Sequence, residues 1–292
     1  PLGGPVQGIL IRANEGRPTK VEGNAAHPYN QGATDVFAQA SVLNLYDPDR
    51  SRVVRRAGEA SSSWRDFVAF ARQMRDGGVQ GNVAVLAEPN DSPTLARLRG
   101  EMEAAYPGLR WITYRALGDD TGALGTQQAL GRPLRPNYDY ANADIIVSFD
   151  SDEMGAEHLG TIANQRGIAA SRRITEGRRS TMSRIYLVES QMSPMAGMAD
   201  HRVRMRAADI PHLASAVAAR LGVGSATATG TALMTADAHA APILEALIED
   251  VQAAQGRVVI SAGGTLPPEV HALVAARNAE YGQEVVRYYD TG

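Results

Sequence analysis

A short apolar run that stops at a group of acids is the feature that most constrains the fold of this chain. Residues 145–149 read Ile-Ile-Val-Ser-Phe, follow the polar turn residue Asp144, and end at Asp150, Asp152 and Glu153. Runs this short and this rich in β-branched residues are typical of a strand that is buried on both faces of a parallel sheet. We therefore expect 145–149 to be a central strand of an α/β sheet.

The acids after this run stand where open α/β sheets bind their ligands. Such ligands lie beyond the carboxyl ends of the strands, so the loop 150–155 is the first candidate for a functional site. Asp150 and Asp152 could bind a ribose or a metal ion there. The alternative, which we favour, is that the acids solvate a loop and cap the next helix.

Residues 63–78, far upstream of this strand, show the period of a helix. Ser63 and Asp66 form a capping box, and apolar residues then recur at helical spacing until Gly77-Gly78. Trp64 lies on the apolar stripe, so we expect this side chain to pack against the parallel sheet.

The remaining segments alternate between strand and helix patterns, with a β-hairpin at 8–22 and a short helix at 35–45 in front of them. Strands are expected at 83–87, 109–114, 184–189, 258–262 and 285–289, and helices at 210–221, 238–255, 268–281 and from Ser92-Pro93 to the turn 106–108. A Gly-rich loop precedes the central strand, and 285–289 is expected to complete a β-α-β unit. This order predicts a doubly wound α/β fold with parallel sheets covered by helices.

Three ranges are predicted as domains. Residues 1–58 form an N-terminal hairpin and irregular segment, 59–224 an α/β domain, and 225–292 a second α/β subdomain or a continuation that is truncated at the C-terminus. The Ala/Thr/Gly-rich stretch 222–235 is the expected linker. The chain has no initiator methionine and no signal peptide, so we expect it to be a piece of a longer polypeptide.

Composition excludes several kinds of site. The 292 residues include no cysteine, which removes disulfides, thiolate zinc sites, cysteine-ligated iron–sulfur clusters and cysteine nucleophiles. The net charge of −3 gives no case for nucleic-acid binding, and no run of 18 apolar residues could span a bilayer. The six histidines are scattered without metal-ligand spacing. We therefore expect no catalytic and no metal-binding residues.

The motif search leaves one weak phosphate signal. The chain lacks G-x-G-x-x-G, a Walker A loop, G-x-S-x-G and H-E-x-x-H. Gly263 and Gly264 lie between a strand and a helix, where backbone N–H groups could hold a phosphate. A tight β–α turn explains these glycines about as well.

Arginines concentrate between residues 166 and 184. The six are Arg166, Arg172, Arg173, Arg178, Arg179 and Arg184, against one acid, Glu176. With little apolar periodicity the stretch is expected to be a long exposed loop, and guanidinium groups suit carboxylate or phosphate partners. In a lone chain the loop would only be solvated. In an assembly, these arginines would bind another subunit or the rest of the same polypeptide.

Two groups of motifs resemble known proteins. Residues 16–28 (GRPTKVEGNAAHP), with 38–41 (AQAS) and 45–50 (LYDPDR), resemble the N-terminal signature of the molybdopterin oxidoreductase superfamily. Catalytic members carry a cluster-binding cysteine, and then a lysine, a few residues after a G-N-x-x-H-P-x-N-x-G stretch. Here Asp35 stands near the cysteine position and the lysine is missing. The resemblance therefore implies a retained architecture without the cluster ligands.

The second group is more particular. The central segment 140–155, followed by 184–190 (RIYLVES), 199–202 (ADHR) and 266–273 (LPPEVHAL), is similar to one half of the iron–sulfur subunit of alternative complex III. That complex is a bacterial quinol:electron-acceptor oxidoreductase, and the half in question is molybdopterin-oxidoreductase-like but carries no molybdenum cofactor. The iron–sulfur clusters belong to a following ferredoxin-like half, which is absent from this sequence.

The resemblance implies a function as well as a fold. It implies a non-catalytic, cofactor-free structural scaffold in a membrane-associated respiratory complex for quinol oxidation, peripheral on the periplasmic side of the bacterial inner membrane. The implied partners are the ferredoxin-like iron–sulfur half of the same subunit, integral-membrane quinol-binding subunits and a multihaem cytochrome c subunit. The alternative is an oxidoreductase domain that still binds a molybdopterin or nucleotide cofactor at Asp150, Asp152, Gly263 and Gly264. A free-standing nucleotide-binding domain would need a phosphate loop, which the sequence lacks.

Overall fold

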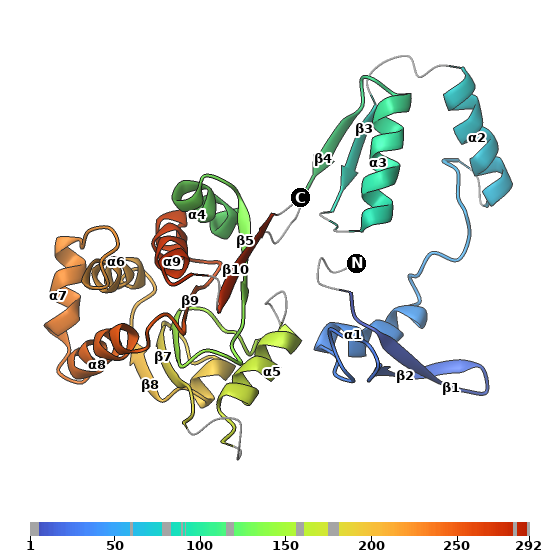
Figure 1. Ribbon diagram of the computed structural model, residues 1–292. Helices are drawn as coiled ribbons and strands as arrows, with labels where there is room; N and C mark the ends of the chain where they lie inside the picture. The colour runs from blue at the N-terminus through green and yellow to red at the C-terminus, as the bar shows by residue number, and fades with distance from the viewer. Residues whose placement is uncertain are drawn as a thin grey trace. The chain divides into compact units, whose positions relative to one another are not determined.

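The protein folds as two compact units. The computed structural model describes residues 6–58, 61–77, 83–88, 90, 92–114, 120–155, 161–174, 181–282 and 285–290. Unit 1 is Pro1–Leu117 and unit 2 is Gly118–Gly292 (Figure 1). This division differs from the predicted ranges 1–58, 59–224 and 225–292.

Unit 1 begins with the predicted hairpin and continues with an α-β-α-β series. Its elements are β1 (Ile9–Asn14), β2 (Arg17–Gly23), α1 (Val36–Ala40), the 3₁₀ helix η1 (Ser41–Leu45), α2 (Trp64–Asp76), β3 (Ala84–Ala87), α3 (Pro93–Ala105) and β4 (Arg110–Thr113). Glu15 and Gly16 both have positive φ (52° and 77°), which matches a two-residue hairpin turn. β3 and β4 pair in parallel, as a β-α-β unit requires.

The helix starts in unit 1 were predicted correctly, but the structure does not show the expected packing of Trp64 against the parallel sheet. Ser63 and Asp66 form the capping box of α2, and the Ser92 side chain accepts from the Leu95 N–H at the start of α3. Trp64, expected in the core, is 71% exposed and contacts Phe67 edge-on. The apolar stripe of α2 is real, but within the described residues it is not covered.

Unit 2 holds most of the buried residues. Its elements are α4 (Asp120–Leu130), β5 (Leu134–Tyr138), β6 (Ile145–Phe149), α5 (Thr161–Ser171), β7 (Arg184–Glu189), the 3₁₀ helix η2 (Pro194–Gly197), β8 (His201–Arg204), α6 (Ile210–Arg220), α7 (Ala228–Ala236), α8 (Ala240–Ala253), β9 (Val258–Ala262), α9 (Pro268–Glu280) and β10 (Val286–Asp290). All pairings of the four-stranded sheet, in the order β8-β7-β6-β9, are parallel.

The sheet is covered on both faces, which confirms the doubly wound α/β prediction. Every residue of β6 is buried, and β7 and β9 flank it. Val147 and its neighbours on one face pack against α6, α8 and α9, while Ile146 on the other face packs with Ile168 of α5. The continuous apolar run thus forms a central strand because both of its faces meet helices.

Three parts of the predicted element order were wrong. The expected Gly-rich loop before the central strand contains α4 and β5, and the expected linker 222–235 contains α7, which packs with α6 and α8. β10 pairs antiparallel with β5, so it does not complete a β-α-β unit with β9.

Candidate functional site

The sheet order places the predicted ligand-binding edge between β6 and β9. From β6 the chain crosses through α5 to β7 on one side, and later returns as β9 on the other side. This reversal is a topological switch point, the usual ligand site of open α/β sheets. The structure brings Asp150 at the end of β6 next to Gly263 at the end of β9. The sequence-based pairing of these two loops is therefore correct in space.

The two loops lie in direct contact at this edge. A Cβ atom added to Gly263 would lie 1.9 Å from the Asp150 carbonyl oxygen, so only glycine fits there. The Gly263 N–H donates to the Phe149 carbonyl at 2.9 Å, and the Gly264 carbonyl accepts from Thr121 Oγ1 at 3.1 Å. The glycines thus serve a tight β–α turn, as the alternative interpretation expected, and the Gly263 N–H already has an acceptor.

Asp150 binds the neighbouring strand end. Its φ of 50° is unusual for a residue with a side chain and turns the chain sharply at the end of β6. Its Oδ1 accepts from both the backbone N–H and the hydroxyl of Ser190, at 3.0 and 3.2 Å. The Asp150 carboxylate therefore ties the end of β6 to the segment after β7.

The other two acids of the loop are also used as internal acceptors. Asp152 Oδ1 accepts from the N–H groups of Met154 and Met195, at 3.2 and 3.1 Å. Glu153 is fully buried, and it accepts from Ser151 Oγ at 2.7 Å and from Asn164 Nδ2 at 2.8 Å. No group of three metal-ligating side chains occurs in the part of the chain that the structure describes. The loop is a hydrogen-bonded support in which the acids face protein donors.

A buried polar cluster lies beneath this loop. The hydroxyls of Tyr140 and Ser261 are buried without a hydrogen-bond partner of normal geometry among the described residues. Burial raises the pKa of Tyr140 well above its ordinary value, and the nearby charge of Glu153 adds to the effect. Tyr140 therefore stays protonated at physiological pH and has no features of a general base.

The arginine-rich stretch is not the long loop that was expected. Arg166 lies in α5 and Arg184 begins β7, while Arg178 and Arg179 lie outside the described residues. Arg173 is exposed just after the end of α5. The prediction that these arginines bind a partner stays a prediction, but two of them have internal carboxylate partners.

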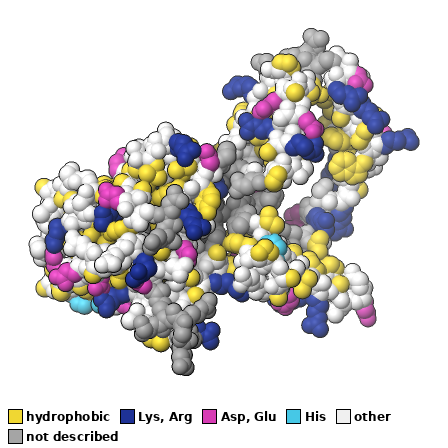
Figure 2. Space-filling view, in the orientation of Figure 1, with side chains coloured by type: hydrophobic (Ala, Val, Ile, Leu, Met, Phe, Trp, Pro, Cys, Tyr) yellow, Lys and Arg dark blue, Asp and Glu magenta, His cyan; other side chains and the backbone are white. Residues whose placement is uncertain are grey.

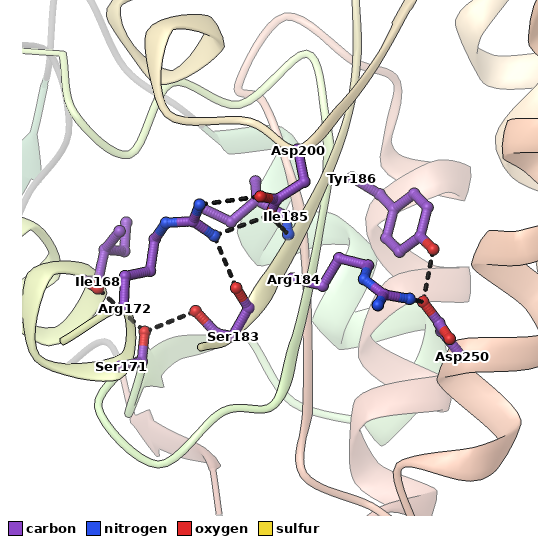
Figure 3. Close-up of polar contacts among 9 residues, drawn as sticks. All are labelled: Ile168, Ser171, Arg172, Ser183, Arg184, Ile185, Tyr186, Asp200 and Asp250. Carbon is purple, nitrogen blue, oxygen red and sulfur yellow. Dashed lines mark hydrogen bonds and ion pairs between the residues drawn. The ribbon is translucent and has the colours of Figure 1, made fainter. Parts of the chain in front are cut away.

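Arg172 joins three segments of unit 2 (Figure 3). Its guanidinium donates to both Asp200 oxygens, at 2.7 and 2.9 Å, and to the Ser183 carbonyl at 2.6 Å. Asp200 also accepts from the Ile185 N–H at 2.8 Å. Burial opposes ionisation of Asp200, but the bonds from Arg172 and Ile185 bring the pKa of Asp200 below its ordinary value. The arginine clasps the end of α5 to the starts of β7 and β8.

Arg184 has a similar internal partner. Both Arg184 and the Tyr186 hydroxyl donate to Asp250 on α8, the latter at 2.5 Å (Figure 3). Burial first, and then the bond to Asp250, raise the pKa of Tyr186 to about 12. Sequence reasoning missed both clasps because Asp200 and Asp250 are 28 and 66 residues from their arginines. A local charge count cannot reveal such partners.

The N-terminal segment shows how Asp35 is used at the position where the superfamily resemblance expects a cluster ligand. Asp35 is the N-cap of α1: its Oδ1 accepts from the Ala38 N–H at 2.7 Å, and its Oδ2 accepts from Gln7. The buried Asn30 holds this segment by bonding to both backbone groups of Gly8 and to the Ala33 carbonyl. The donor set does not fit a four-iron cluster, which needs thiolates.

Comparisons with known proteins find similarity both in sequence and in fold. No family model matches the chain. It is 24% identical over 169 residues to the "Menaquinone reductase, molybdopterin-binding-like subunit" of Nitratidesulfovibrio vulgaris, an alignment that covers 56% of this chain and 24% of that protein. The fold matches that of acetylene hydratase from Pelobacter acetylenicus with a TM-score of 0.56 and 10% identity, over 96% of this chain and 42% of that one.

The chain covers only part of the length of each of these two proteins. The chain spans about a quarter of the curated relative and less than half of the solved structure. Among the helices that the structure describes, none is both long and apolar enough to cross a membrane. The fold is molybdopterin-oxidoreductase-like, and the sequence is similar to that of a molybdopterin-binding-like subunit of a quinone reductase.

Proposed function

We propose that this chain is a cofactor-free structural scaffold within a membrane-associated respiratory quinone oxidoreductase, of the alternative complex III type. It supports neighbouring subunits and catalyses no reaction itself. The similarity to a subunit of menaquinone reductase supports the class of complex. The motifs at 140–155, 184–190, 199–202 and 266–273 support the finer assignment to alternative complex III.

The observation that carries the scaffold role is the contact between the Asp150 carbonyl and Gly263. A cofactor bound at the switch point would need free donors and space at this edge. Instead, the Gly263 N–H bonds to Phe149, and Asp150 and Asp152 accept hydrogen bonds from backbone groups of their own chain. These internal contacts support the proposal that no pterin or nucleotide binds at this edge, where the alternative function would need one.

The lost cluster site supports the same proposal. Asp35 stands near the position at which the superfamily has a cysteine that binds the N-terminal iron–sulfur cluster. In this chain, Asp35 caps a helix instead. A redox centre elsewhere in the chain would then lack this electron relay. The iron–sulfur clusters of the complex belong, on this proposal, to a ferredoxin-like half of the same subunit. The other partners are integral-membrane quinol-binding subunits and a multihaem cytochrome c subunit on the periplasmic side.

Fewer arginines now remain as candidates for binding a partner subunit. Arg172 and Arg184 stabilise unit 2 through Asp200 and Asp250, so they are poor candidates for binding a neighbour. Arg173, Arg178 and Arg179 stay the candidates, together with Arg166, which lies in α5.

The test is purification from the native membrane through an affinity tag on this chain. We expect quinol-oxidising activity, iron–sulfur clusters and haem to co-purify with it. In a second strain Arg173, Arg178 and Arg179 are changed to serine, and we expect part of the complex to be lost at moderate salt. Arg220→Ser, which breaks a surface pair with Glu245, is the matched control and should leave the complex intact. Recovery of the tagged wild-type chain free of any partner would contradict the proposal.

A further inference from the structure

Helix α2 presents a broad apolar face that no described residue covers. Its apolar side chains lie on one side of the helix, with Arg75 at the C-terminal end of that side, and Arg65 and Arg72 lie outside it. The exposed fractions are 71% for Trp64, 51% for Phe67, 40% for Val68, 52% for Phe70 and 45% for Met74. No residue of the helix is buried, and Figure 2 shows exposed apolar side chains, in yellow, in the region of α2 and α3. A soluble protein rarely leaves such a stripe open.

The parallel strands β3 and β4 have an open face in the same unit. On one face, Val85 and Trp111 are partly buried, and Trp111 lies beneath the Arg99 guanidinium of α3 at 5.5 Å. On the opposite face, Leu86 is 70% and Ile112 is 41% exposed. Parallel sheets in proteins are normally covered on both faces. Helix α3 covers one face of this sheet, and the other face lacks its layer.

We propose that α2 docks its apolar face onto the open Leu86–Ile112 face of the β3–β4 sheet and completes an α/β/α unit. Each surface is apolar, uncovered and in need of a partner, and both belong to unit 1. Crossovers between parallel strands of one sheet are right-handed in nearly all proteins, so the order β3–α3–β4 assigns α3 to one face and leaves the opposite face to another helix.

The lengths agree with this docking. Seven residues, 77–83, separate Asp76 at the end of α2 from Ala84 at the start of β3, which is close to the usual range of about 2–6 residues for helix-to-strand connections. A helix of 13 residues is about 20 Å long, and a strand of four residues about 13 Å, so one helix can cover both strands. The amphipathic stripe then has a structural role, which also accounts for the sequence pattern around Trp64.

A lipid surface is the competing occupant, because arginines flank the apolar face and such helices bind bilayers. Two observations favour the sheet. A bilayer bound to α2 would leave Leu86 and Ile112 uncovered. In addition, Asp66 and Asp76 lie on the same helix, with Asp66 fixed in the capping box and Asp76 paired with Arg75, so the helix itself carries little net positive charge.

Tryptophan fluorescence of the whole chain tests the docking. The chain has two tryptophans, so Trp111→Phe leaves Trp64 as a single reporter. We expect Trp64 in the dilute, lipid-free protein to emit at short wavelength and to be several-fold less accessible to acrylamide than a free tryptophan analogue. Adding Leu86→Glu should shift the emission to longer wavelength and restore quenching. Leu124→Glu, at an exposed site in unit 2, is the control and should change neither.

A crosslinking experiment tests the same docking in a protein that keeps Trp111. The chain has no cysteines, so Phe67→Cys with Ile112→Cys creates one pair across the proposed contact. We expect a short bifunctional maleimide to join them within one chain. Thr113→Cys replaces Ile112→Cys in the control, because Thr113 is the exposed neighbour on the opposite face and should not crosslink to position 67.

Several results would overturn the docking. The first is full quenching of Trp64 in the dilute protein, together with equal crosslinking of position 67 to positions 112 and 113. The second is burial of Trp64 that appears only when anionic vesicles are added. The second result would assign the face to lipid. Burial that disappears on dilution would assign it to a second protein chain.

Discussion

The contact between Gly263 and Asp150 predicts the effect of a single added methyl group. In Gly263→Ala, the new Cβ would lie 1.9 Å from the Asp150 carbonyl oxygen and 2.7 Å from its carbonyl carbon. Normal contacts need about 3.5 Å, so the two strand ends must separate by roughly 1.5 Å. Both ends are fixed: the Asp150 N–H bonds to Val188 at 2.7 Å, and the Gly263 N–H bonds to Phe149 at 2.9 Å.

The cost of this separation can be placed within the known range. Overpacking a well-packed site costs about 1–3 kcal/mol. Because the clash is with backbone rather than with a flexible side chain, we expect the upper end, about 3 kcal/mol of unfolding free energy. Gly197→Ala is the matched control: nothing lies within 4 Å of its added Cβ and its φ is not positive, so the change should stay within about 0.5 kcal/mol.

The assay must report on unit 2. Both tryptophans, Trp64 and Trp111, belong to unit 1, so urea unfolding of unit 2 is followed by far-ultraviolet circular dichroism. Tryptophan fluorescence of the same samples then gives the transition of unit 1, which should not change. Equal midpoints for Gly263→Ala and Gly197→Ala would refute the close contact at the switch point, and with it the reason to exclude a ligand there.

Three further predictions concern unit 2. The Asn278 amide bonds to both backbone groups of Ile260, so Asn278→Leu should cost about 2–4 kcal/mol and speed hydrogen exchange of the Ile260 amide; unchanged exchange would contradict this. The pKa of Asp200 is below 3.8 because its bond to Arg172 helps to outweigh the effect of burial, so its contribution to stability is present above that pH and is lost as the pH falls. Asp200→Asn should flatten the acid arm of the stability curve, and an equally steep arm would be inconsistent with the clasp. Burial raises the pKa of Tyr186 from 10.0 to about 12, so its contribution is full below pH 10 and is lost towards pH 12; Tyr186→Phe should reduce that alkaline loss, measured by urea midpoints.

The central strand could be predicted because its signal is local. The run 145–149 is apolar at both even and odd positions, and only a strand covered on both faces needs that pattern. The acids that follow were correctly placed at the sheet edge for the same reason. Which donors they bind could not be predicted, since Ser190, Met195 and Asn164 come from separate elements.

Glycines are the reason that helices α4 and α7 were not predicted from the sequence. Gly125 in α4 faces His271 of α9, where an added Cβ would lie 2.3 Å from the His271 Cβ. Gly230 in α7 lies equally close to the carbonyl of His212 in α6. A glycine that permits close helix packing and a glycine that forms a turn look the same in a sequence. Both segments were therefore interpreted as loops or linkers.

The sequence revealed helix α2 but not the surface that its apolar stripe contacts. The helix and its capping box were clear from Ser63 and Asp66, but periodicity does not say which surface meets the apolar side. The same holds for the arginines: Arg172 was assigned to a partner because only one acid, Glu176, is near it in the sequence, whereas the fold supplies Asp200.

The measurement that tests the central claim most directly is the cofactor content of the purified chain. The protein is expressed in a host that makes molybdopterin, and molybdenum, tungsten and iron are quantified by mass spectrometry, with pterin fluorescence measured after oxidative release. The scaffold account predicts far less than one equivalent of each metal and no released pterin, because Gly263 lies against the Asp150 carbonyl and Asp35 caps a helix. Stoichiometric molybdenum or tungsten together with a released pterin would contradict it and establish the oxidoreductase alternative.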